Sequence, residues 1–416
     1  MAVSECAELR LAVVSPFLDR SHGTERALSE VLERLARDYP CEVHLFAQRV
    51  EGLSVVSASD CAGADPSRIV LHRIPALGVP HLLQFIAWYF RNRSARRNFA
   101  RSSGKPFDLV FSPGINCSDA DVIIVHALFR RLRDLAQKDV GSGGVLRNLH
   151  RKIYYCLLTQ LEHRIYGNPT VSLAAVSPRT KADLATFFNR HDVAVIPNAV
   201  AGETFTPKFR LALRDKMRAH FGFAPEEFVL LLIGNDWTNK GLPTVLQSMA
   251  LLPNLPLRLL VVGNDDAEPF RKMADALKIL VRCRWEPPAP HVINFYAAAD
   301  AYVSPSLEDS FGMPVSEAMA CGLPAITSTS AGISAFVEDG VNAFVLQDPR
   351  DSQALAACLQ EIYANIDLLE KIGSAAASIA GEWTWDRATA QVWQLLNAAL
   401  AAKSRTTVAH SASPGA

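Results

Sequence analysis

The chain has 416 residues, of which 49% are hydrophobic and 20% charged, and its 42 Lys and Arg residues balance 42 Asp and Glu residues. This length predicts two or three domains, and the zero net charge excludes a general attraction to nucleic acid. Eight scattered cysteines without a Cys-x-x-Cys pair argue against a disulfide framework or a zinc site and indicate a reducing compartment.

The sequence shows no sign of a targeting or membrane-spanning segment. Residues 1–8 lack the basic and apolar parts of a signal peptide. No apolar run reaches the roughly 18 residues that a spanning helix needs. We therefore expect a cytoplasmic protein, with a peripheral place on the inner face of the cytoplasmic membrane as the favoured location.

The first elements in chain order predict a doubly wound α/β domain. Residues 9–15 are typical of a buried strand, residues 25–37 of an amphipathic helix, and residues 41–46 of the next strand. A strand, a loop, a helix and a second strand are how such domains begin. The first loop contains Gly23, which by itself indicates only a strand-to-helix turn.

Residues 81–105 combine aromatic side chains with a basic run that contains no acidic residue. Over residues 81–164 there are 14 Lys and Arg residues against 6 Asp and Glu residues, so this part is basic in a neutral chain. A helix of this kind can lie on an anionic bilayer, and Trp88 and Tyr89 adjoin the charge. The alternative is a domain helix with a solvated basic side. A nucleic-acid site is disfavoured because no nucleic-acid motif accompanies the patch.

Residues 108–111 and 122–125 predict two more strands, and His126 directly follows the second. Functional groups of α/β proteins gather at the carboxyl ends of strands, which makes His126 a candidate site residue. A lone histidine can equally have a structural role.

The strand pattern restarts in a second half after residues 201–207, which predict a hinge. Residues 228–233 are typical of a buried strand, and Lys240 lies in the loop that follows it. The spacing does not fit a P-loop, because Asn239 and not glycine precedes Lys240. Residues 258–263 and 281–285 predict the next strands, and Arg284 lies in the second of them.

Residues 301–324 predict a strand, a loop of small residues and a helix that begins near Pro314. This order directs free backbone N–H groups and the positive end of a helix dipole toward one point. Asp309 in the loop and Glu317 in the helix flank that point. Such a site can hold a phosphate on one side and hydroxyl groups on the other, and a nucleotide-sugar has both.

This stretch resembles the signature of family-4 retaining glycosyltransferases, in which two glutamates seven residues apart bracket Phe-Gly and precede Ala-Met-Ala-x-Gly-x-Pro. Phe311, Gly312, Glu317 and residues 318–324 match. Asp309 stands where the first glutamate is expected, with Glu308 one position earlier, so either carboxylate can serve; the register favours Asp309.

Weaker matches extend the resemblance over most of the chain. Lys240 fits the family's Gly-Arg-x-x-x-x-Lys-Gly run, but Asn235 replaces its arginine. Gly23 is the one residue kept from the glycine-rich first loop, and His126 fits a histidine that contacts the donor sugar. The Gly-Asn-Asp-Trp-x-x-Lys-Gly run looks most like that of lipopolysaccharide-core glucosyltransferases.

The resemblance implies a GT-B fold, with two Rossmann-like domains facing each other across a cleft. The expected boundaries are residues 8–200 with a crossover helix 386–402 for the acceptor-side domain, 201–385 for the nucleotide-sugar domain, and a disordered tail 403–416. It also implies transfer of a hexose with retention, from a UDP- or GDP-sugar, without a metal or another cofactor.

The resemblance assigns roles to individual residues. Asp309 would hold sugar hydroxyls, Glu317 the ribose, and His126 the far side of the sugar. The other donor-binding residues that it implies are Gly23, Asn235, Lys240, Arg284, Phe311, Gly312 and Met313.

The expected partners are a nucleotide-sugar, a membrane-associated glycan or glycolipid acceptor such as lipopolysaccharide core, and an anionic membrane surface bound by residues 81–105. One alternative is a soluble glycosyltransferase that acts on a small acceptor. Another is a catalytically inactive sugar- or lipid-binding relative, which the replacements at Asn235 and Asp309 favour.

Overall fold

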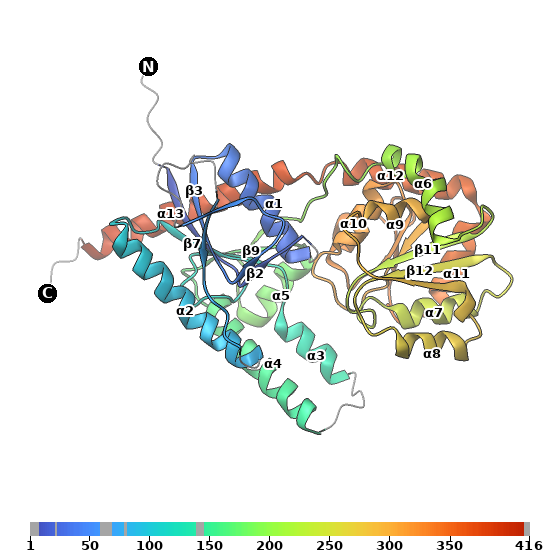
Figure 1. Cartoon of the computed structure of the whole chain (residues 1–416), viewed down its shortest axis with the longest axis horizontal. Coiled ribbons are helices and arrows are strands. Elements are labelled where there is room, and N and C mark those ends of the chain that lie inside the picture. The colour runs from blue at the N-terminus through green and yellow to red at the C-terminus, as the bar shows by residue number, and fades with distance from the viewer. Residues whose placement is uncertain (1–7, 21–22, 59–68, 79–80, 139–144, 412–416) are drawn as a thin grey trace, which may run out of the picture. The chain divides into compact units, whose positions relative to one another are not determined.

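A computed structural model describes residues 8–20, 23–58, 69–78, 81–138 and 145–411. The chain forms two compact units (Figure 1). Unit 1 combines Met1–Pro197 with Trp385–Ala416, and unit 2 is Asn198–Thr384.

Unit 1 is built on a parallel sheet of eight strands in the order β10-β9-β8-β7-β1-β3-β6-β5. The chain winds from β1 to one side and then returns to β7 on the other side, so the winding direction changes beside β1. A separate pair joins β2 (Phe17–Leu18) and β4 (Arg49–Val50). The strands of the large sheet are β1 (Leu9–Val14), β3 (Cys41–Ala47), β5 (Val55–Ser57), β6 (Ile69–Arg73), β7 (Leu109–Ser112), β8 (Val122–Val125), β9 (Ser172–Ala175) and β10 (Ala194–Val195).

Helices cover this sheet and bury their apolar faces on it. The first, α1 (Gly23–Asp38), confirms the predicted amphipathic helix and buries Leu28, Leu32 and Leu35. The other helices of unit 1 are α2 (His81–Ser102), α3 (Phe129–Lys138), α4 (Val145–Tyr166), α5 (Pro178–Phe188) and α13 (Trp385–Ser411).

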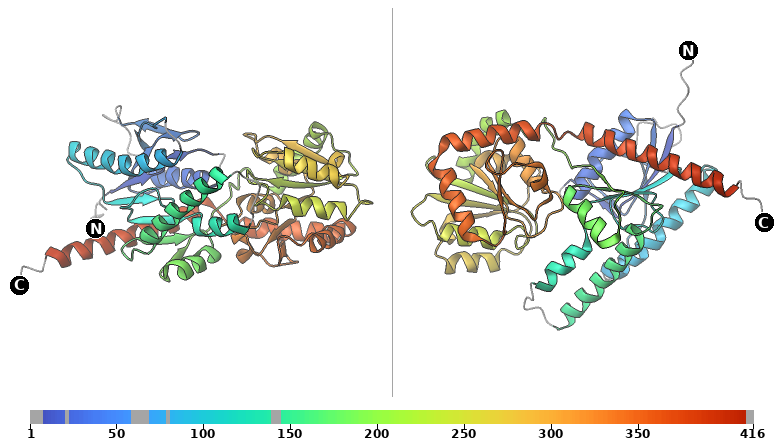
Figure 2. Two further views of the ribbon diagram at one scale, coloured as in Figure 1. Left: turned by 90° about the horizontal axis from the view of Figure 1, so that it is seen from below. Right: turned by 180° about the vertical axis from the view of Figure 1, so that it is seen from behind.

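The last helix corrects the predicted tail. Helix α13 continues through Ser411, so residues 403–411 are helical, and residues 412–416 lie outside the described part. It packs against α1, β7 and β8, and it runs along unit 1 (Figure 2). Lys403 continues this packing, because its Nζ donates to Asp121 Oδ2 at 3.0 Å and to the Asp108 carbonyl oxygen at 2.8 Å. These tertiary bonds, which composition does not reveal, fasten the first residue of the predicted tail to unit 1.

Helix α2 divides the predicted aromatic and basic residues between the core and the surface. Trp88 is buried in the core of unit 1, with 1% of its surface exposed. It therefore does not form part of an exposed aromatic and basic surface, contrary to the expectation from the sequence. Arg96 is also buried and pairs with Asp119 at 2.7 Å. Leu83 and Phe90 remain 54% and 67% exposed. No helix in the described part of the chain is both long enough and apolar enough to cross a bilayer.

Unit 2 contains a parallel sheet of six strands in the order β13-β12-β11-β14-β15-β16. Its strands are β11 (Phe228–Ile233), β12 (Leu257–Val262), β13 (Cys283–Glu286), β14 (Ala301–Val303), β15 (Ala325–Ser328) and β16 (Phe344–Leu346). Its helices are α6 (Pro207–Phe221), α7 (Leu242–Ala250), α8 (Glu268–Ala276), α9 (Ile293–Ala298), α10 (Met313–Ala320), α11 (Ser352–Ala364) and α12 (Ile366–Ala380), with 3₁₀ turns at Leu280–Arg282 and Gly332–Phe336.

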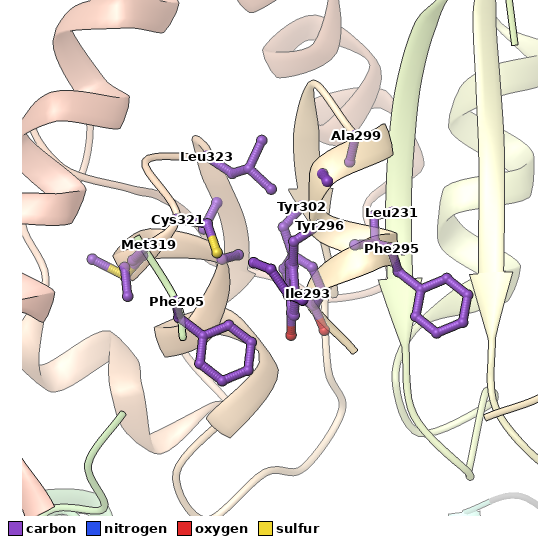
Figure 3. Packing of buried hydrophobic residues seen from close by; sticks show 14 of the residues in the cluster. Phe205, Leu231, Ile293, Phe295, Tyr296, Ala299, Tyr302, Met319, Cys321 and Leu323 are labelled. Carbon is purple, nitrogen blue, oxygen red and sulfur yellow. The ribbon is translucent and has the colours of Figure 1, made fainter. Parts of the chain in front are cut away.

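Two apolar clusters hold the sheet of unit 2, one on each face. Successive residues of a strand point to opposite faces, so Leu231 joins the cluster under α6, α9 and α10 while Leu232 joins the one under α7, α8 and α11. Figure 3 shows the first cluster, in which Tyr296 lies beside Phe205 with ring centroids 5.7 Å apart. Burial on both faces explains why β11 and β14, in the middle of this sheet, read as continuous apolar runs.

We expect the start of α3 to depend on a buried carboxylate. Glu162, which is fully buried, accepts bonds from the N–H groups of Phe129 at 2.6 Å and Arg130 at 3.0 Å. Glu162→Gln keeps the shape but replaces one accepting oxygen by an NH2 group, which cannot accept from an N–H. It therefore removes one of these bonds and should lower the free energy of unfolding by about 1 kcal/mol. Urea unfolding measures this loss.

The same variant should change how stability depends on pH. Burial raises the pKa of Glu162 to about 7, against the opposing effect of the two N–H groups. A carboxyl whose pKa is higher in the folded chain contributes its stability in full below the unfolded value and loses it as pH rises through about 7. The deficit of Glu162→Gln should therefore shrink between pH 5 and pH 8, and a deficit that grows with pH would contradict the raised pKa.

Candidate functional site

The polar residues of unit 2 gather where its winding direction changes. Strands β11 and β14 are neighbours, with Leu230 paired to Ala301. The chain leaves β11 toward β12 on one side and leaves β14 toward β15 on the other side. Loops at the carboxyl ends of such strands diverge and leave room for a ligand between them. Residues 234–241 form the loop after β11, and residues 304–312 form the loop after β14.

An ion pair joins these two loops. Lys240 Nζ lies 2.5 Å from Asp309 Oδ2, and the two side chains are 17% and 18% exposed. The sequence predicted both residues as site residues but gave no indication that they bind each other. The structure therefore brings the predicted diphosphate cation and the predicted sugar carboxylate together.

Asn239 holds the backbones of the two loops in register. Its Nδ2 donates to the Glu308 carbonyl oxygen at 2.8 Å, and its Oδ1 accepts from the Glu308 N–H at 3.0 Å. Its own carbonyl oxygen accepts from the Leu307 N–H at 2.7 Å. The residue after Asn239 is Lys240 and the residue after Glu308 is Asp309, so this pairing sets the two charged groups opposite each other. Sequence reasoning missed this role, because a loop asparagine carries no distinctive signal.

Helix α10 begins beside the ion pair. Gly312 has φ of 103°, a backbone conformation that favours glycine, and it precedes a helix with Pro314 in its first turn and no side-chain cap. The Phe311 N–H donates to Asp309 Oδ1 at 3.2 Å, so this N–H is already engaged. The N–H groups of Gly312 and Met313 have no hydrogen-bond partner among the described residues. They leave the positive end of the helix dipole open to an anion.

Glu317 lies one turn inside α10 and is only 3% exposed. Its Oε2 accepts from the Tyr296 hydroxyl at 2.8 Å, and the same hydroxyl is 3.2 Å from the Pro314 carbonyl oxygen. Burial and the nearby carboxylate raise the pKa of Tyr296 well above its usual value, so the hydroxyl stays protonated and donates. Tyr296 was not predicted as a site residue, since it reads as an ordinary core position.

The other predicted donor-binding residues of unit 2 are engaged elsewhere. Asn235 is exposed, and its Oδ1 accepts from the Asn264 N–H at 3.1 Å. The Arg284 guanidinium lies 2.7 Å from Glu286 and 5.7 Å from the centre of the Phe221 ring. Neither residue has a described contact with the ion pair, so Lys240 is the cation that the structure places at this point.

Two predicted residues belong to unit 1. His126 follows β8 and is half-buried, and burial lowers the pKa of its imidazole to about 4, so the ring is neutral at pH 7. Gly23 is the exposed first residue of α1. Among the described residues no group of three or more His, Cys, Asp or Glu side chains could hold a metal ion.

Sequence comparison places a known domain over unit 2. Residues 214–378 match the family model described as Glycosyl transferases group 1. The D-inositol 3-phosphate glycosyltransferase of Paenarthrobacter aurescens is 29% identical over 231 residues, which are 52% of this chain and 55% of that protein. The chain thus spans about half of the length of this curated relative.

Structure comparison extends over nearly the whole chain. WaaG, described as a glycosyltransferase involved in lipopolysaccharide biosynthesis, aligns with a TM-score of 0.73 at 18% identity, covering 92% of this chain and 98% of WaaG. Anabaena HepE, solved with UDP-glucose, aligns with a TM-score of 0.67 at 16% identity, covering 94% of this chain and all of HepE. The chain therefore has the GT-B fold that its sequence predicted.

We expect Gly241, at the end of the lysine loop, to tolerate no side chain. Its φ is 78°, and a Cβ there would lie 2.2 Å from the Pro305 carbonyl oxygen. Gly241→Ala should therefore lower the free energy of unfolding by more than about 2 kcal/mol and displace Lys240 from Asp309. Gly222→Ala is the matched control, because Gly222 has φ of 72° but open space around it, and it should cost about 1 kcal/mol. Equal losses in urea unfolding would contradict the predicted clash.

Proposed function

We propose that this chain, which has the GT-B fold and carries a group 1 glycosyltransferase domain over residues 214–378, transfers a hexose from a UDP- or GDP-sugar to a membrane-associated glycan or glycolipid. The transfer proceeds with retention of the anomeric configuration and without a metal ion. The geometry of Lys240, Asp309 and the start of α10 is the observation that supports this proposal.

These groups suit the two halves of a nucleotide-sugar. The ammonium of Lys240 and the N–H groups of Gly312 and Met313 can face a diphosphate, while the Asp309 carboxylate accepts hydrogen bonds from sugar hydroxyls. Glu317 is the carboxylate proposed for the ribose. The likeness to HepE, whose structure was solved in complex with UDP-glucose, supports a nucleotide-sugar as the donor.

The reaction breaks the bond between the anomeric carbon and the diphosphate oxygen, and it forms a bond from that carbon to the acceptor oxygen. Negative charge builds on the leaving diphosphate, where Lys240 and the helix start stabilise it. The acceptor attacks on the face that the diphosphate leaves, and a diphosphate oxygen takes the acceptor's proton. His126, neutral at pH 7, positions the sugar as a hydrogen-bond partner and does not add charge.

An anionic membrane surface is the proposed site of the acceptor. Leu83, Ile86 and Phe90 recur at helical spacing on α2 and are 54%, 37% and 67% exposed. Arg97 and Arg101 are exposed one turn apart on the same helix. Exposed apolar side chains beside arginines fit a bilayer that offers both acyl chains and anionic headgroups. The role of WaaG in lipopolysaccharide biosynthesis supports an acceptor such as lipopolysaccharide core, on the inner face of the cytoplasmic membrane.

A catalytically inactive sugar- or lipid-binding relative is the second candidate. One observation favours it. Asn235 replaces an arginine and Arg284 is held by Glu286, so Lys240 is the one predicted donor-binding cation that the described residues place beside the helix start. Such a protein would bind a nucleotide-sugar without releasing the nucleotide. A soluble enzyme with a small acceptor is the third candidate, and it would not bind vesicles.

Donor binding should depend on Lys240. A panel of UDP-, GDP- and ADP-sugars should raise the melting temperature for at least one donor, because a ligand that binds the folded state stabilises it. Lys240→Ala should abolish this rise, whereas Lys272→Ala, at an exposed lysine on α8, should keep it. The rise and the turnover should both survive EDTA. An unchanged rise in Lys240→Ala would remove Lys240 from the site, and turnover that needs added magnesium would contradict the metal-free reaction.

Vesicle binding should depend on the charge of α2. Arg97→Glu with Arg101→Glu should weaken sedimentation with vesicles of anionic lipid by about tenfold or more, since each basic residue contributes on the order of 1 kcal/mol near such a surface. The matched control reverses two neighbouring charges of unit 2, Arg271→Glu with Lys272→Glu, and should sediment like the unaltered chain. Equal loss in both pairs, or recovery of the unaltered chain in the supernatant, would favour a soluble enzyme.

A further inference from the structure

The ion pair of the candidate site has a consequence for which nucleotides bind. Lys240 and Asp309 are assigned to different parts of the donor, yet they lie 2.5 Å apart and bind each other. Both side chains are largely shielded from water, which strengthens charge interactions relative to bulk solvent. Together they carry no net charge, so the pair as a whole does not attract a diphosphate.

The two loops cannot easily separate to relieve this constraint. Asn239 bonds to both backbone groups of Glu308, and the Asp309 N–H and carbonyl oxygen bond to Ser330 at 3.2 Å and Gly332 at 2.7 Å. A phosphate that reaches the Lys240 ammonium is therefore brought close to the Asp309 carboxylate.

Resting on the proposed function, we infer that Asp309 makes the site select nucleoside diphosphate sugars over bare nucleoside diphosphates. A donor with its sugar offers hydroxyl groups to the carboxylate, which replaces the contact that Lys240 gives up. A bare diphosphate offers no such donor, and its terminal phosphate carries about one more negative charge near neutral pH. Asp309 therefore repels the bare nucleotide and accepts the sugar-bearing one.

This selection also acts at the end of the reaction. When the sugar leaves with the acceptor, Asp309 loses its hydroxyl donors. Once the proton taken from the acceptor has passed to solvent, Asp309 faces a diphosphate that carries about one more negative charge. The carboxylate then favours return of Lys240 to the ion pair and release of the product. Asp309 thus determines specificity as well as holding the sugar.

Calorimetric titration of matched pairs tests this inference: UDP against UDP-glucose, GDP against GDP-mannose, and ADP against ADP-glucose. For the pair that binds, the unaltered chain should bind the sugar-bearing member at least as tightly as the bare one. Asp309→Asn keeps an oxygen that can accept from the Phe311 N–H but removes the charge. It should tighten the bare nucleotide about tenfold and weaken the sugar-bearing one, which inverts the preference.

Two further variants guard against a folding defect and against a general charge effect. Asp309→Glu keeps the carboxylate and should keep the preference of the unaltered chain. Glu308→Gln removes the adjacent negative charge and should also keep the preference of the unaltered chain. This result would decide between Glu308 and Asp309, either of which could serve as the first carboxylate according to the sequence. A preference that shifts equally in Glu308→Gln and Asp309→Asn would overturn the assignment to Asp309.

The outcomes separate this inference from the proposed function. If no pair binds the unaltered chain, the proposed function fails and the inference with it. If a pair binds but the bare nucleotide is the tighter member in the unaltered chain, or Asp309→Asn weakens both members equally, the selection is wrong while the proposed function stands.

Discussion

The ion pair between Lys240 and Asp309 joins two loops that lie 69 residues apart in the chain. The parallel sheet makes this meeting possible, because β11 and β14 are neighbours whose onward connections run in opposite directions. Asn239 then holds the two loops within hydrogen-bond distance of each other. The charged side chains of the next residues therefore face one another. Because the two loops are already held in place, less conformational entropy is lost when a ligand binds between them.

Helix α10 is held at both ends. This matters because a helix dipole is aligned with the helix axis, so the direction of the helix sets where its positive end lies. At its start, the Ile333 N–H donates to the Phe311 carbonyl oxygen at 2.6 Å, just before Gly312. At its end, Arg210 Nε of α6 donates to the Cys321 carbonyl oxygen at 2.8 Å. The Tyr296 hydroxyl ties the first turn to Glu317 from within the core. The apolar cluster of Figure 3 therefore also orients the N–H groups of the candidate site.

Unit 1 combines the candidate residue His126 with a helix, α2, whose two faces differ in character. Burial lowers the pKa of the His126 imidazole to about 4, and a neutral ring suits a partner for hydroxyl groups rather than for phosphate. Helix α2 fixes itself to the sheet with Trp88 and the ion pair of Arg96 with Asp119, and it leaves other apolar and basic side chains outside. The same helix can thus be part of the core on one face and a contact surface on the other.

The sequence by itself determined the doubly wound α/β class and the region of the candidate site, and its resemblance to a glycosyltransferase signature implied the GT-B fold. Buried strands, amphipathic helices and the Phe-Gly-x-x-x-x-Glu run are patterns of residues close together in the chain, so they can be recognised from the sequence alone. The tertiary structure alone decided which of these residues bind each other. It paired Lys240 with Asp309, bonded Asn239 to the backbone of Glu308, and placed the Tyr296 hydroxyl against Glu317. It also decided the burial of Trp88 and the helix through Ser411. Each depends on a partner far away in the chain, and the distance between such partners is set by packing of the sheet and not by any spacing that the sequence displays.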